Sequence, residues 1–91
     1  MNNKAVILKV YGKVQGVGFR FYTQKRAQEL SLKGFVQNKT DGSVYIEAEG
    51  EAAHLEMFVL WCDEGPSWAR VTKVEKQFVP VLERDEGFFI R

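Results

Sequence analysis

The sequence has 91 residues, of which 45% are hydrophobic and 27% are charged, and its formal net charge at pH 7 is +1. This length fits one small domain, residues 1–91, and the hydrophobic share is ordinary for a globular core. The nearly neutral charge gives no reason to expect a nucleic acid or a membrane surface as a partner, and the single cysteine excludes an internal disulfide.

Alternating apolar residues predict a first strand over residues 4–11, with Val6, Leu8 and Val10 on one face. The apolar run inside it is too short for a signal peptide or a membrane span, and one cysteine suits a reducing compartment, so we expect a cytoplasmic protein. A glycine-rich stretch follows, and helical spacing then predicts a helix that ends near Leu30. The apolar stripe of this helix is predicted to be Phe19, Tyr22, Thr23, Ala27 and Leu30.

The later elements are predicted as strands over residues 34–38, 43–49, 71–79 and 87–91 and a helix over residues 51–64. Asp41-Gly42 is typical of the turn between the second and third strands, and Gly50 is expected to end the third. Gly65-Pro66 is expected to end the second helix. Its buried stripe is predicted to be Leu55, Phe58, Val59 and Cys62, and the inward residues of the third strand to be Val44, Ile46 and Ala48.

This order predicts an α+β fold with ferredoxin-like βαββαβ topology. We expect an antiparallel sheet, two helices on one of its faces, and a short C-terminal strand. Such a fold hosts many functions, so the side chains must decide between them. One cysteine and one histidine, His54, cannot form a Cys/His zinc site, and His54 is expected to be exposed and inert. No base is visible beside a nucleophile, so an enzyme of this sequence would work by placing charges.

The join between the first strand and the first helix lacks an ordinary helix start. Residues 12–19 contain no Ser, Thr, Asp or Asn to cap the first N–H groups, and Arg20 is a cation at the positive end of the helix. Gly16 and Gly18 permit left-handed backbone angles that turn successive N–H groups one way. These features favour a bound anion, most often phosphate. A tight turn with a surface arginine is the alternative that spacing alone leaves open.

Residues 12–20, Gly-Lys-Val-Gln-Gly-Val-Gly-Phe-Arg, resemble the signature of the acylphosphatase family. Residues 34–44 and 65–71 match as well, in the order and at the spacing of the family, so the resemblance covers nearly the whole chain. It implies hydrolysis of the carboxyl–phosphate bond of small acyl phosphates, without a metal or an organic cofactor. We also expect a monomer, because no exposed apolar stripe is evident.

The resemblance implies a role for individual residues. By motif match, the phosphate is held by Gln15, Gly16, Val17, Gly18, Phe19 and Arg20. Asn38 at the end of the second strand orients the attacking water, so that Arg20 and Asn38 are the catalytic residues. Without the resemblance, an asparagine just before a turn is more typical of a turn former. Its amide both donates and accepts hydrogen bonds, which suits it to hold a water.

The alternative is a non-catalytic phosphate- or RNA-binding module on the same fold. Lys33-Gly34-Phe35-Val36 is weakly similar to an RNA-recognition strand, but the similarity stops at Val36 and falls on the second strand instead of the third. The net charge of +1 also argues against RNA. A domain that senses phosphate without turnover stays open, because binding and catalysis would use the same loop.

Overall fold

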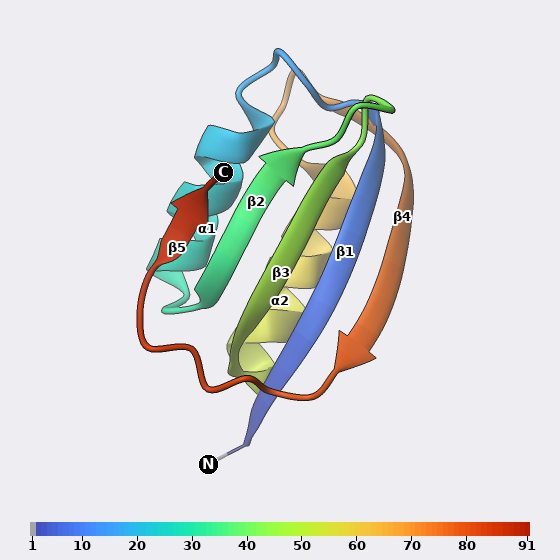
Figure 1. Ribbon diagram of the computed structural model, residues 1–91. Coiled ribbons are helices and arrows are strands. Elements are labelled where there is room, and N and C mark those ends of the chain that lie inside the picture. The colour runs from blue at the N-terminus through green and yellow to red at the C-terminus, as the bar shows by residue number, and fades with distance from the viewer. Residues whose placement is uncertain (1) are drawn as a thin grey trace.

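The structure, a computed structural model, describes residues 2–91 and consists of one five-stranded sheet with two helices (Figure 1). The elements are β1 (Asn3–Lys13), α1 (Phe19–Glu29), β2 (Lys33–Asn38), β3 (Val44–Glu51), α2 (Ala52–Glu64), β4 (Arg70–Val79) and β5 (Phe88–Ile90). The strand order is β4-β1-β3-β2-β5, in which β5 pairs parallel with β2 and all other neighbours are antiparallel. The ferredoxin-like α+β prediction is confirmed.

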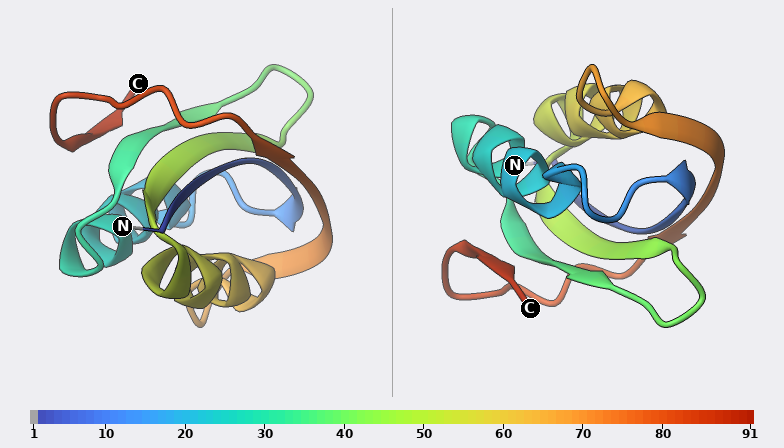
Figure 2. Two further views of the ribbon diagram at one scale, coloured as in Figure 1. Left: turned by 90° about the horizontal axis from the view of Figure 1, so that it is seen from below. Right: turned by 90° about the horizontal axis from the view of Figure 1, so that it is seen from above.

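Both helices cover one face of the curved sheet (Figure 2). The connection from β4 to β5, residues 80–87, crosses the other face and carries the chain from one edge of the sheet to the opposite edge (Figures 1 and 2). Within residues 2–91, neither helix combines the length and the apolarity that crossing a bilayer requires.

The core lies between the helices and the sheet, and the predicted periodicities account for most of it. The inward residues of β3 and the stripe of α2 are buried as predicted: Val44, Ile46, Ala48, Leu55, Phe58, Val59 and Cys62. Val6, Leu8 and Val10, which share one face of β1, are buried with them. The prediction for Tyr22 is wrong, because its ring lies partly exposed against Trp68, with the ring centroids 5.8 Å apart.

The prediction that Gly50 ends the third strand is also wrong. Gly50 pairs with Lys4, and Glu51 pairs with Asn3, so the β1–β3 ladder continues to the first residue before α2. A Cβ at Gly50 would lie 2.6 Å from a methyl carbon of Leu32, which is buried in the core. The glycine therefore permits a close approach inside a strand instead of interrupting it.

Candidate functional site

The loop between β1 and α1 begins at an irregular point in the sheet. The register between β1 and β4 shifts between Tyr11 and Gly12, as in a β-bulge. Gly12 has a φ of 126°, and a Cβ there would lie 2.1 Å from the carbonyl oxygen of Arg70. Only glycine allows the two backbones to approach this closely, and the irregularity directs the chain out of the sheet toward the loop.

The loop reaches α1 through two left-handed glycines. Gly16 has a φ of 73°, and Gly18, the N-cap residue, has a φ of 78° and a ψ of 13°. No side chain caps the helix and no acidic residue lies in its first turn, as the sequence predicts. The backbone N–H of Tyr22 donates to the Gly18 carbonyl at 3.1 Å. The N–H groups before Tyr22 have no partner within the helix, so they form a cluster of donors at its positive end.

Two side-chain hydrogen bonds hold the loop in place. Gln15 Nε2 donates to the carbonyl oxygens of Lys39 and Ser43, both at 2.8 Å, and so fastens the loop to the turn between β2 and β3. Trp68 Nε1 donates to the carbonyl oxygen of Val17 at 2.5 Å. The loop is therefore tied to two segments that are distant from it in the sequence.

The loop, the start of α1 and the end of β2 surround a hollow of about 200 Å³. Its lining residues are Val14, Gly16, Gly18, Phe19, Arg20, Phe21, Asn38 and Ile90. Arg20 and Asn38, which the family resemblance implies to be the catalytic residues, both line it although they lie on different elements. Arg20 Nη1 donates to the Arg91 carbonyl oxygen at 3.5 Å, and Asn38 Oδ1 is buried without a hydrogen-bond partner among residues 2–91.

The structure assigns the predicted binding residues to two positions. Four of them line the hollow: Gly16, Gly18, Phe19 and Arg20. The other two make the hydrogen bonds that hold the loop, in which the Gln15 side chain donates and the Val17 carbonyl oxygen accepts. Sequence reasoning missed three lining residues: Val14, Phe21 and Ile90.

Two of the missed residues, Phe21 and Ile90, differ in how much the sequence reveals of them. Phe21 falls off the apolar stripe of its helix, which signals an exposed aromatic next to Arg20. Ile90 has no local signal, because it reaches the hollow only through the parallel pairing of β5 with β2.

The other reactive side chains lie outside this hollow. Cys62 is buried on α2, and burial raises the pKa of its thiol, so the thiolate is disfavoured. His54 also lies on α2 and is partly exposed. No group of three or more His, Cys, Asp or Glu residues in the part of the chain that the structure describes is arranged to hold a metal ion.

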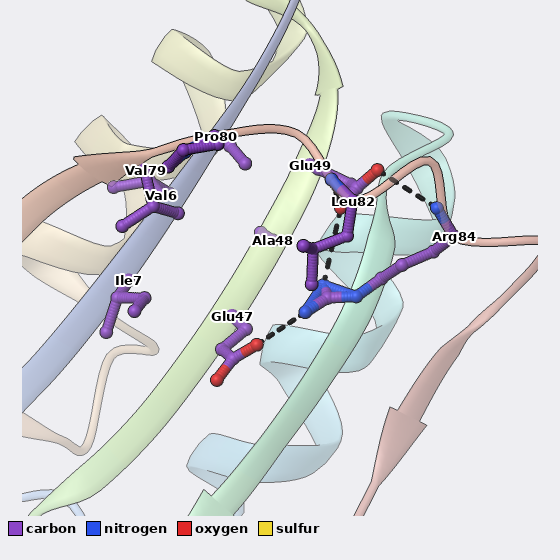
Figure 3. Close-up of a pocket in the computed structure, with 10 residues that line it drawn as sticks. Val6, Ile7, Glu47, Ala48, Glu49, Val79, Pro80, Leu82 and Arg84 are labelled. Atoms are coloured by element: carbon purple, nitrogen blue, oxygen red, sulfur yellow. Dashed lines mark hydrogen bonds and ion pairs between the residues drawn. The ribbon is translucent and has the colours of Figure 1, made fainter.

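A second hollow, of about 240 Å³, lies on the face of the sheet opposite the helices (Figure 3). Its walls are mainly apolar, and its charged residues pair with one another: Arg84 contacts both Glu47 and Glu49. With two carboxylates around one guanidinium, this hollow does not suit a phosphate. The donor-rich hollow at the start of α1 is therefore the candidate functional site.

Comparison with known proteins agrees with this fold. The family model described as acylphosphatase matches residues 6–90. The chain is 55% identical over 67 residues to an acylphosphatase of Mannheimia succiniciproducens, with 74% of each chain covered. It is 43% identical over 88 residues to an acylphosphatase of Salinibacter ruber, with 97% of this chain and 93% of the relative covered.

A solved structure of an acylphosphatase also resembles this chain over nearly its whole length. The structure of an acylphosphatase from Coxiella burnetii superimposes with a TM-score of 0.92 at 38% sequence identity. The match covers 99% of this chain and 94% of that one, so it extends over β5 as well as the central strands.

Proposed function

Because this chain belongs to the acylphosphatase family, we propose that it binds the phosphoryl group of a small acyl phosphate in the loop of residues 15–20 and orients the attacking water with Asn38. The reaction is hydrolysis of the carboxyl–phosphate bond, which yields a carboxylate and inorganic phosphate. The family resemblance expected from the sequence is confirmed. The alternative of a non-catalytic phosphate- or RNA-binding module is not favoured.

One observation carries the assignment of roles: Arg20 and Asn38 line one hollow at the start of a helix that has no side-chain cap. The uncapped N–H groups and the left-handed glycines supply backbone donors for phosphoryl oxygens. The guanidinium of Arg20 adds a fixed positive charge and planar, bidentate donors. These groups stabilise the charge on the phosphoryl group as the bond to the carboxylate breaks.

The water is the part of the reaction in which Asn38 acts. Its Oδ1 is a buried acceptor without a partner in the described part of the chain, and a water that donates to it would satisfy an otherwise costly group. The oxygen of that water attacks phosphorus and forms the new P–O bond, its two protons stay with the phosphate product, and the carboxylate departs with the electron pair of the broken P–O bond. Because a carboxylate is a good leaving group, the step requires no general acid. No carboxylate, histidine or cysteine lines the hollow within residues 2–91.

The proposal has four further parts. We propose that the reaction needs no metal ion, since the lining of the hollow offers amide and guanidinium donors and not metal ligands. We propose a monomer, since the exposed large apolar side chains are spread over α1, α2, β4, β5 and two loops. We also propose a cytoplasmic location, which the single free cysteine supports, and no nucleic-acid partner, which the net charge of +1 supports. One domain over residues 1–91 follows from the length of the chain.

Two substitutions separate phosphate binding from the positioning of water. We expect Arg20→Ala to lose inhibition by inorganic phosphate together with activity, because its cation holds the phosphoryl group. We expect Asn38→Ala to keep phosphate inhibition while kcat falls on the order of 100-fold, as when an oxyanion-hole donor is removed. Steady-state hydrolysis of acetyl phosphate measures activity in both variants and phosphate inhibition in Asn38→Ala. For Arg20→Ala, stabilisation of the fold against urea by inorganic phosphate measures phosphate binding.

Matched controls are available on the same elements. Arg26→Ala removes a partly exposed arginine from the last turn of α1. Gln37→Ala changes the neighbour of Asn38 on β2, and the side chain of Gln37 points to the opposite face of the sheet from that of Asn38. His54→Ala removes the one histidine. We expect all three to retain the rate of the unsubstituted protein. Full activity in Arg20→Ala or Asn38→Ala, or loss of activity in His54→Ala, would contradict the proposed mechanism.

A further inference from the structure

The candidate site has an apolar rim that phosphate binding does not explain. Phe21 and Ile90 line the same hollow as Arg20, yet their side chains are 56% and 41% exposed. They belong to two elements that pack against each other, the first turn of α1 and the short strand β5. Large apolar side chains left exposed at a binding hollow commonly mark a surface that a ligand covers.

We propose that Phe21 and Ile90 form the subsite for the acyl group, and that the site favours acyl phosphates whose acyl group is apolar, aromatic ones above all. This inference rests on the proposed function. When the phosphoryl group occupies the donors deep in the loop, the acyl group must lie outside them, at the opening of the hollow. An aromatic acyl group there packs against the ring of Phe21 and the side chain of Ile90.

The charges of the hollow support the same substrate class. Among its lining residues in the described part of the chain, Arg20 is the one charged side chain, and the phosphoryl group uses it. The guanidinium of Arg91, close in sequence to Ile90, lies 3.9 Å from the ring centre of Phe35, which lines a different hollow. An acyl group with its own negative charge would therefore meet an apolar rim without a second cation to pair with it.

The rim should act on substrate binding more than on the chemical step. Contacts to the acyl group are made in the bound substrate and persist in the transition state, so their loss raises KM and leaves kcat comparatively unaffected. This pattern differs from that of Asn38→Ala, in which kcat falls. The two kinds of residue can thus be distinguished by the same kinetic constants.

The test is the ratio of kcat/KM for benzoyl phosphate to kcat/KM for acetyl phosphate. We expect Phe21→Ala to lower this ratio roughly tenfold, about 1.4 kcal/mol, mainly through KM for benzoyl phosphate. Ile90→Ala should lower it in the same direction. Phe78→Ala is the matched control, since Phe78 is 60% exposed but lies on β4, at the opposite edge of the sheet from β5.

The outcomes separate this inference from the function on which it rests. An unchanged ratio in Phe21→Ala and Ile90→Ala, or equal losses for both substrates, would overturn the acyl subsite while hydrolysis itself stands. A fall in Phe78→Ala equal to that in Phe21→Ala would overturn it as well. If the unsubstituted protein hydrolysed neither substrate, the proposed function and the subsite would fail together.

Discussion

Arg20 stands where a cation is unfavourable for its own helix. The first turn of α1 contains no acidic residue, and its N-cap, Gly18, supplies no side-chain hydrogen bond. Arg26 lies in the last turn, where a positive charge is favourable because the negative end of the helix dipole is there. A residue that works against local helix stability is typical of a functional site, and the hollow beside Arg20 is consistent with a bound anion that offsets this cost.

Ser31 is a second residue whose conformation does not suit its type. It follows α1 with a φ of 56°, while its N–H donates to the Gln28 carbonyl and the N–H of Leu32 donates to the Ala27 carbonyl. This is the Schellman arrangement, in which glycine is usual at the position of Ser31. We expect Ser31→Gly to raise the free energy of unfolding by about 1 kcal/mol, because glycine enters the left-handed region without the steric cost.

Urea denaturation measures this change, and Ser67 provides a control. Ser67 is exposed and is not among the residues with a positive φ. Ser67→Gly should leave stability unchanged or lower it slightly, since glycine makes the unfolded chain more flexible. Equal effects of the two substitutions would show that the backbone angle at Ser31 carries no cost.

Asp41 makes the turn between β2 and β3 sensitive to pH. Its carboxylate accepts hydrogen bonds from the Ser43 hydroxyl at 2.5 Å and the Ser43 N–H at 3.0 Å, and it pairs with Lys9 at 3.1 Å. The hydroxyl, the N–H and the lysine, in that order, hold the pKa of Asp41 well below its usual range. A pKa that is lower in the folded state means that the stabilisation is present above the unfolded value and is lost as the pH falls.

We therefore expect Asp41→Asn to be less stable than the unsubstituted protein at neutral pH, with a difference that narrows below about pH 4, near the pKa of an unfolded aspartate. Urea midpoints of both proteins between about pH 7 and pH 3 measure the difference. If the difference between the urea midpoints of the two proteins were the same at every pH in this range, ionisation of Asp41 would contribute nothing to stability.

At the level of the elements, residues 80–87 are held to the sheet by hydrogen bonds and ion pairs with glutamates of β3. Glu49 on β3 is 4% exposed, and it accepts the N–H groups of Leu82 at 3.3 Å and Arg84 at 3.2 Å. The guanidinium of Arg84 lies 3.6 Å from Glu49 and also contacts Glu47 (Figure 3). The short strand β5 thus depends on side chains of β3 as well as on its pairing with β2.

Removal of Arg84 tests this dependence. Arg84→Met keeps much of the apolar stem but leaves Glu49 buried without its cation, and we expect the free energy of unfolding to fall on the order of 3 kcal/mol. Arg70→Met, at an exposed position of β4, should change it by less than about 0.5 kcal/mol. If the two variants were equally stable in urea, the charge pairing would not be what holds the connection.

At the scale of the whole molecule, strand and helix periodicity was enough to predict the element order and the buried faces. It failed where tertiary contact overrides local preference. Gly50 is a strand breaker by type, yet the ladder with β1 and the approach of Leu32 keep it inside β3. Tyr22 has the spacing of a buried residue but lies against the exposed ring of Trp68.

The site was predictable to the extent that its residues are adjacent in the chain. The missing helix cap, the two glycines and Arg20 are local features, and the family resemblance added Asn38. The anchoring role of the Gln15 side chain and the presence of Ile90 depend on contacts between segments far apart in sequence, which no spacing reveals. The exposed state of Phe21 follows from its position off the helix stripe, but its place at the hollow does not.

In the proposed reaction, the loop and Arg20 hold the phosphoryl group for hydrolysis by water without a metal ion. Its most direct test is the rate of benzoyl phosphate hydrolysis by the purified protein in excess chelator, beside that of Arg20→Ala. We expect unimpaired turnover in chelator and nearly complete loss of turnover in the variant. Turnover that disappears with chelator, or that survives the loss of Arg20, would contradict it.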